Sequence, residues 1–186
     1  MTRQRNEIDQ LVYDKITIPG SALKRGFSIY VIEVKYQKER YFYIGMTGDP
    51  YYPSARAIIH RVSGHLELNS RSTQNQLLKA LKDKGIDESK FDDLTVDFHY
   101  FPIPGFIPLV DDGFKGMNSE DIKVLDGYDD YQDARKEVFE MEKYLICKYD
   151  DDPKVQILNK AIIKADKPAG NEKIIAAVDK IIWDGR

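Results

Sequence analysis

Two consecutive runs of β-forming residues, joined by a short polar turn, constrain the fold of this chain most. Residues 27–36 are rich in Tyr, Ile and Val, and residues 40–46 return to that composition after the polar residues 37–39. This pattern predicts an antiparallel hairpin. The first run contains Ser28-Ile29-Tyr30 and the second contains Tyr43-Ile44-Gly45, so the hairpin would bring two phenols together.

Size and composition favour one domain with a single core. The chain has 186 residues, of which 42% are apolar, and this is enough to bury one substantial core. The apolar runs are too short to span a bilayer, and no secretory signal is visible at the N-terminus. The single cysteine, Cys147, excludes an internal disulfide and a multi-cysteine zinc site. We therefore expect a cytoplasmic protein without a membrane partner.

Charge is distributed unevenly along the chain. Residues 1–90 carry 15 basic and 10 acidic side chains, and the remainder carries 13 basic and 21 acidic ones. A basic first half is compatible with a surface that faces phosphates. Ordinary scatter of surface charge explains the same numbers equally well.

The remaining pattern predicts an α+β domain with flanking helices. After the hairpin, residues 94–101 alternate as a third strand, residues 102–130 are loop-like, and residues 155–158 either extend the sheet or lie over it. A polar loop at residues 48–53 precedes Ser54, a predicted helix cap. Helices are predicted over residues 5–14, 55–68, 72–84 (stopped at Gly85), 131–149 and 171–183.

Helical geometry separates two Arg-x-x-x-His pairs on residues 55–68. At 100° per residue, Arg61 and His65 flank the apolar face, whereas Arg56 and His60 point roughly the opposite way. Only Arg61 and His65 lie at the border of the core, where packing could hold them against a site on the sheet.

The same construction places Glu142 inside the apolar face of the helix at 131–149. A carboxylate there is costly unless it is paired, hydrogen-bonded or bound to a metal. An ion pair with a nearby cation, for example Arg135, is one explanation. The other is a ligand for a hard cation such as Mg²⁺, which needs only one or two protein carboxylates.

These side chains suit phosphodiester hydrolysis, which needs a base for water and positive charge near phosphorus. A tyrosine is a weak base at its usual pKa of about 10, but Arg61 and a metal would lower it.

The chain resembles the GIY-YIG nucleases from Ser28 to Asn159. Ser28-Ile29-Tyr30 stands for the first motif, and Tyr43-Ile44-Gly45 matches the second. Arg61 and His65 match the Arg-x-x-x-His of the family's first helix. Glu142 matches its metal-binding glutamate, and Asn159 matches the asparagine that closes the domain.

The resemblance implies a central three-stranded antiparallel sheet flanked by helices. It divides the chain into an N-terminal arm (1–26), a nuclease domain (27–160) with an insertion at 102–130, and a C-terminal helical extension (161–186). It also implies cleavage of DNA with one Mg²⁺ or Mn²⁺ ion.

The resemblance also implies a role for each matching residue. Tyr30 would activate water, with Tyr43 positioning water or phosphate. Arg61 would stabilise the scissile phosphate, and His65 would bond a phosphate oxygen or relay a proton. Glu142 would bind the metal. Gly45 and Asn159 would support the site.

The chain departs from the family pattern in four places. Ser28 replaces a glycine, and the twelve residues between Tyr30 and Tyr43 predict a longer hairpin turn. Residues 48–54 form an insertion before the arginine helix, which leaves Arg56 and His60 as a competing alignment. Residues 102–130 are a further elaboration.

The sequence identifies candidate residues for target binding but does not identify the target. Arg56, His60 and Arg71 are candidate nucleic-acid contacts. The apolar stripe at residues 174–183 is either core packing or the contact of a homodimer. A non-catalytic module that binds nucleic acid or protein is the alternative function, and the chain has no Walker-type loop for small phosphate esters.

Overall fold

The computed structural model describes residues 16–50, 53, 55–67, 76–104, 117–160, 165–167 and 172–184. The predicted helix at 5–14, the predicted cap Ser54 and the candidate contact Arg71 lie outside these residues.

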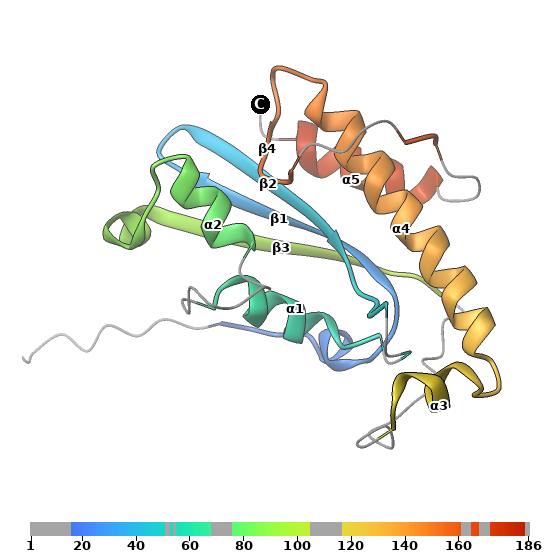
Figure 1. Cartoon of the computed structure of the whole chain (residues 1–186). Coiled ribbons are helices and arrows are strands. Elements are labelled where there is room, and N and C mark those ends of the chain that lie inside the picture. The colour runs from blue at the N-terminus through green and yellow to red at the C-terminus, as the bar shows by residue number, and fades with distance from the viewer. Residues whose placement is uncertain are drawn as a thin grey trace, which may run out of the picture.

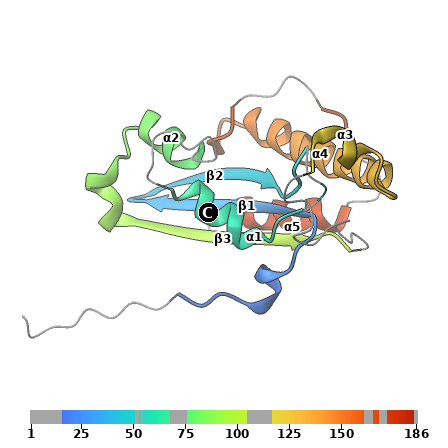
Figure 2. The same cartoon turned by 60° about the horizontal axis from the view of Figure 1, so that its bottom comes forward.

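A four-stranded mixed sheet forms the centre of an α+β fold. β1 (Ser28–Tyr36) lies between β2 (Glu39–Met46) and β3 (Leu94–Pro102) and is antiparallel to both. Figure 2 shows these three strands side by side. β4 (Gln156–Ile157) adds a short parallel strand to the outer edge of β2. The predicted α+β class is therefore confirmed, the expectation of three antiparallel strands is wrong, and residues 155–158 extend the sheet.

The turn between β1 and β2 is tight. Tyr36 pairs with Glu39, so only Gln37 and Lys38 connect the strands. Gln37 has a φ of 55°, in the left-handed region that tight hairpin turns use. The predicted longer turn is wrong, because the additional residues lengthen the paired strands instead.

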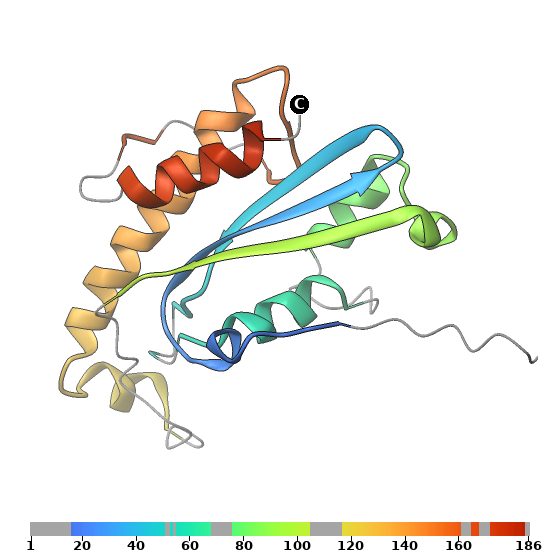
Figure 3. The same ribbon diagram turned by 180° about the vertical axis from the view of Figure 1, so that it is seen from behind.

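Helices cover both faces of the sheet. α1 (Ile58–His65) and α2 (Gln76–Asp83) pack on one face, and α4 (Tyr128–Asp150) and α5 (Glu172–Trp183) pack on the other (Figures 1 and 3). Alternate β1 residues therefore enter two different cores. Ile29 and Val31 belong to the core under α4 and α5, whereas Tyr30 and Ile32 belong to the core under α1 and α2. Burial on both sides explains why β1 has four consecutive apolar or aromatic residues, from Ile29 to Ile32.

The α1 and α2 helices end where local geometry stops them. α1 is shorter than predicted and begins after Ala57, whose ψ of 144° is extended. α2 ends before Gly85, which has a φ of 76°. The N–H of Ile86 donates to the carbonyl of Leu81, and that of Gly85 donates to Lys82. These two bonds satisfy the last carbonyls of the helix and form a glycine-dependent cap.

The segment at 102–130 is more structured than its composition predicts. α3 (Ser119–Lys123) forms where the Asn118 side chain accepts hydrogen bonds from the N–H groups of Glu120 and Asp121. α4 starts at Tyr128, directly after Gly127. Two 3-10 helices, η1 (Gly20–Leu23) and η2 (Glu88–Asp93), complete the described elements.

α5 is bound to the sheet by packing and by one arginine. Its apolar stripe buries Ile175, Val178 and Ile182 in the core beneath α4. Arg40 on β2 donates to the Ile181 carbonyl near the end of α5 and bonds Glu33 at 2.6 Å. The stripe is thus core packing in this structure, and the homodimer stays a prediction. In the described part of the chain, no helix is long and apolar enough to cross a membrane.

Replacing Ile182 with alanine tests whether α5 belongs to the main core. Ile182 is fully buried, so we expect the free energy of unfolding to fall by about 2–5 kcal/mol. The measurement is urea unfolding. Lys173→Ala on the exposed side of the same helix is the matched control, with an expected change within about 0.5 kcal/mol. An equal effect of the two variants would contradict this placement of α5.

Candidate functional site

The outer edge of β2 loses its partner strand part-way along. The N–H of Leu158 donates to the carbonyl of Phe42 at 2.7 Å, which is the last backbone bond from the β4 side. At Ile44 the Asn159 side chain takes over, because its Oδ1 accepts from the Ile44 N–H at 2.8 Å and its Nδ2 donates to the Ile44 carbonyl at 2.7 Å. An amide side chain thus continues the strand pairing by one step.

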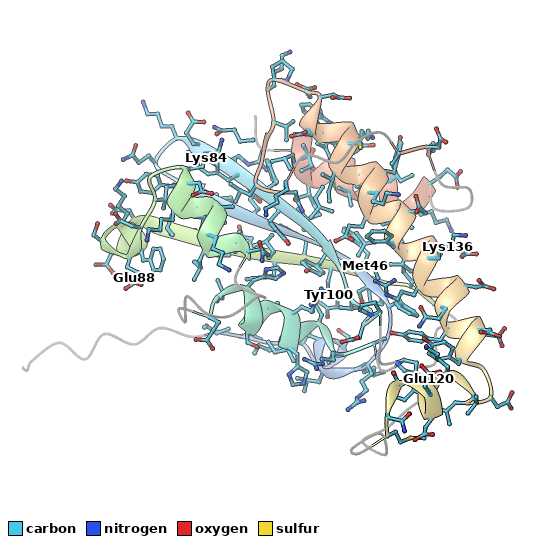
Figure 4. The ribbon with its side chains drawn as sticks, in the orientation of Figure 1. Met46, Lys84, Glu88, Tyr100, Glu120 and Lys136 are labelled. Atoms are coloured by element: carbon cyan, nitrogen blue, oxygen red, sulfur yellow. The ribbon has the colours of Figure 1, made fainter. Side chains whose placement is uncertain are left out.

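Met46 is the next residue of this edge, and two charged side chains satisfy its backbone. Arg61 on α1 donates to the Met46 carbonyl at 3.3 Å. Glu142 on α4 accepts a hydrogen bond from the Met46 backbone. Figure 4 labels Met46 where β2 ends beside α4. The open edge of the sheet therefore brings together an arginine and a carboxylate from opposite layers.

Tyr30 lies flat against β2 because its neighbour there is a glycine. Tyr30 on β1 is opposite Gly45 on β2. A Cβ atom at Gly45 would lie 2.3 Å from both Cζ and Oη of Tyr30. The ring is almost fully buried, so it has no free space to move into. Gly45 is therefore a steric requirement for the position of the Tyr30 phenol.

His65 connects the two tyrosines. Its Nε2 lies 2.7 Å from the Tyr30 hydroxyl. Its ring centroid is 4.7 Å from that of Tyr43 and 5.7 Å from that of Tyr30. His65 is buried at the last turn of α1, and Arg61 lies one turn earlier on the same side. The helix face deduced from the sequence is the one that meets the tyrosines.

Burial keeps the two tyrosines and His65 neutral near pH 7. Burial, together with the charge of Arg61, lowers the pKa of His65 to about 4. Burial raises the pKa of Tyr43 to about 12, with Glu142 adding to the rise. The pKa of Tyr30 rises well above its usual value, again because of burial, although Arg61 opposes the rise. A neutral imidazole can accept the Tyr30 proton on Nε2 when its own proton is on Nδ1.

Glu142 holds a carboxyl group that titrates near neutrality. Burial raises its pKa to about 7, while Arg61, the Met46 backbone and Arg135 act in the opposite direction. Among the described residues, Arg135 influences Glu142 by its charge, without a direct ion pair between them. The ion pair with Arg135, the example given for a nearby cation, is therefore not formed, while pairing with another cation and metal binding both stay predictions.

Two hollows meet at Glu142. The first, here called the arginine hollow, has a volume of about 260 Å³ and is lined by Arg56, Arg61, Arg135, Asp49, Phe139 and Glu142. The second, the lysine hollow, is wider at about 720 Å³ and is lined by Lys79, Lys84, Lys160, Tyr43, Asn159 and Glu142. A carboxylate thus lies between two surfaces that both carry several positive charges.

The other candidate nucleic-acid contacts differ in position. Arg56 is exposed just before α1 and lines the arginine hollow. His60 is exposed on α1 and lines neither of the two hollows. The competing pair Arg56 and His60 is therefore not gathered around the tyrosines, whereas Arg61 and His65 are.

The donor set fits a cation that uses one protein carboxylate. Within the described residues, no group of three or more His, Cys, Asp or Glu side chains gathers as a metal cage. Glu142 lines both hollows, so a cation there would take its remaining ligands from water and a substrate phosphate. Mg²⁺ typically binds in this way.

Sequence reasoning missed two contributors to the site. No sequence signal marks the role of the Met46 backbone, because its lack of a partner strand depends on where β4 ends. Arg135 had one: it precedes Glu142 by seven residues, or two helical turns, and therefore shares its face. The sequence interpretation gives Arg135 only the role of an ion-pair partner of Glu142.

Comparison with protein-family models, curated proteins and solved structures finds no significant match to this chain. Functional inference therefore depends on the chain's own residues and their geometry.

Gly45→Ala tests the close approach of Tyr30 to β2. We expect the added methyl group to displace the ring and to cost about 1–3 kcal/mol of unfolding free energy. In a Tyr30→Ala background the same change should cost far less, because the ring is absent. A double-mutant cycle by urea unfolding measures this coupling, and strictly additive effects would contradict the proposed contact.

Glu142→Gln tests the pKa of the carboxyl group. The folded pKa of about 7 exceeds the ordinary glutamate pKa of 4.5, so the folded state binds more protons, and wild-type stability falls as pH rises through this window. Glutamine stays neutral. In metal-free buffer we therefore expect its stability advantage over wild type to grow by about 1–3 kcal/mol between pH 5 and pH 8.

The measurement is urea unfolding at both pH values, with Glu137→Gln on the exposed side of α4 as the matched control. A pH-independent difference between Glu142→Gln and wild type would show that the carboxyl group has an ordinary pKa.

Proposed function

We propose that this chain is a divalent-metal-dependent endonuclease that hydrolyses DNA phosphodiester bonds, with a GIY-YIG-like fold. One observation carries the proposal: Tyr30, Tyr43, Arg61, His65 and Glu142 converge from β1, β2, α1 and α4 around one open strand edge. This is the set of residues that the resemblance to GIY-YIG nucleases implies.

Arg61 is suited to stabilise charge on the phosphate. Its guanidinium is held by the Met46 carbonyl, and its Nε is buried without a hydrogen-bond partner among the described residues. A buried, fixed donor costs little reorganisation when negative charge develops on the phosphate oxygens. The fork geometry of arginine suits two such oxygens.

Tyr30 and His65 provide a path for the proton of the attacking water. The Tyr30 oxygen takes this proton while its own proton passes to His65 Nε2 over the 2.7 Å contact. The low pKa of His65 keeps the imidazole neutral and makes it a weak base, so the negative charge of the bound phosphate would have to raise this pKa during proton transfer. Tyr43 packs against His65 in a tilted arrangement and lines the lysine hollow, where it can position water or phosphate.

Glu142 is the residue that would hold the metal. A bound Mg²⁺ or Mn²⁺ would stabilise the leaving 3′ oxygen and offset the Glu142 charge that raises the pKa of Tyr30. Because the carboxyl group titrates near pH 7, Glu142 must lose its proton to act as a ligand.

Cleavage of supercoiled plasmid with Mg²⁺ or Mn²⁺ tests the proposal. We expect Glu142→Ala and Arg61→Ala to lower the rate by at least about 100-fold, because each removes charge stabilisation at the reacting phosphate. Lys136→Ala on the outer side of α4 (Figure 4) is the control and should cleave at the wild-type rate.

Two outcomes would overturn the proposal. One is an inert wild-type protein across both metals and across single- and double-stranded substrates. The other is cleavage that persists unchanged in Glu142→Ala and Arg61→Ala.

A further inference from the structure

The arginine hollow is lined by two arginines, Arg56 and Arg135, in addition to Arg61, which is assigned to the reacting phosphate. Arg56 comes from the segment before α1, Arg61 from α1 and Arg135 from α4, and all three line one cavity of about 260 Å³. Asp49 and Glu142 supply the two negative charges of its lining. Three guanidinium groups facing two carboxylates leave the hollow with a net positive charge.

The Arg135 side chain is held by an aromatic ring, but one of its hydrogen-bond donors has no partner among the described residues. Its guanidinium carbon lies 5.7 Å from the centroid of Phe139, one turn further along α4. This cation–π contact fixes the side chain against the helix. The Nε of Arg135 is nevertheless buried without a hydrogen-bond partner among the described residues, as is the Nε of Arg61. Buried donors of this kind are rare, and a bound ligand, ion or water is one explanation for them.

Arg135 enters the arginine hollow from α4 and acts on Glu142 through its charge. Arg61 contacts both Tyr30 and the Met46 carbonyl, at the boundary of the site. Arg135 instead reaches the same cavity from the α4 side together with Phe139, and Tyr43 lines only the other hollow. The arginine hollow and the lysine hollow therefore have different linings and share Glu142.

We propose that the arginine hollow is a second phosphate subsite, in which Arg135 and Arg56 bind the phosphodiester next to the scissile one. The inference rests on the proposed nuclease function and identifies the substrate as a strand that continues beyond the cut. Guanidinium groups from separate elements are the donors that bind phosphate oxygens in pairs. Arg61 and Glu142 line the same hollow, beside this phosphate.

Binding of a short fluorescein-labelled single-stranded oligonucleotide in EDTA tests the subsite without cleavage. Affinity is measured by anisotropy between about 50 and 200 mM salt, where each phosphate contact contributes about 0.7 to the slope of log K against log salt. We expect Arg135→Gln to lower that slope by about 0.7 and to weaken binding about tenfold. Arg135→Lys should keep the slope and lose part of the affinity, because it keeps the charge without the fork.

Lys136→Gln, on the adjacent and outward-facing residue (Figure 4), is the matched control and should change neither quantity by more than about twofold. Thermal unfolding shows whether the variants are folded. The subsite is overturned if wild type does not bind, if Arg135→Gln keeps the wild-type slope, or if Lys136→Gln lowers the slope equally.

The plasmid assay separates the two proposals. If Arg135→Gln loses slope but wild type never cleaves, the phosphate subsite holds and the nuclease proposal fails. If wild type cleaves but the slope is unchanged, the subsite fails alone.

Discussion

The candidate site exists because β4 is too short to cover β2. A sheet edge has backbone N–H and C=O groups that need partners. Along the β2 edge, the Leu158 backbone bonds Phe42 and the Asn159 amide bonds Ile44. Arg61 and Glu142 then bond the backbone of Met46. The last step requires charged side chains from two opposite layers. The unfinished edge thus determines where an arginine and a carboxylate can meet inside one small domain.

Burial at this edge opposes the charged forms of the groups that gather there. The pKa of Glu142 is raised, that of His65 is lowered, and those of Tyr30 and Tyr43 are raised, each mainly because water is excluded. Such a cluster lowers stability compared with apolar packing, and perturbed groups of this kind concentrate at functional sites. Phosphate and a cation would supply the missing charges, which gives the site a physical reason to bind them.

Side-chain periodicity predicted a structural feature correctly where the feature depends on a single helix or strand. The hairpin, β3, α5 and the face of α1 that presents Arg61 and His65 all follow from side-chain periodicity. The predictions were wrong where residues far apart in the sequence determine the structure. The parallel pairing of β4 depends on where α4 delivers the chain, and the tight turn at Gln37 depends on how far β1 and β2 remain paired. α3 was overlooked because one Asn118 cap outweighs a loop-like composition.

The sequence by itself determined which chemistry the chain carries: two phenols on adjacent strands, an Arg-x-x-x-His pair on one helix edge, and a carboxylate on an apolar helix face. Periods of two and 3.6 residues are local, so they place side chains on faces without further information. Only the tertiary structure decided what those faces meet. The packing of two helical layers onto one sheet sets the position of Gly45 against the Tyr30 ring and of Met46 between Arg61 and Glu142. It also brings Arg56 and Arg135, far apart in the sequence, into the lining of one hollow.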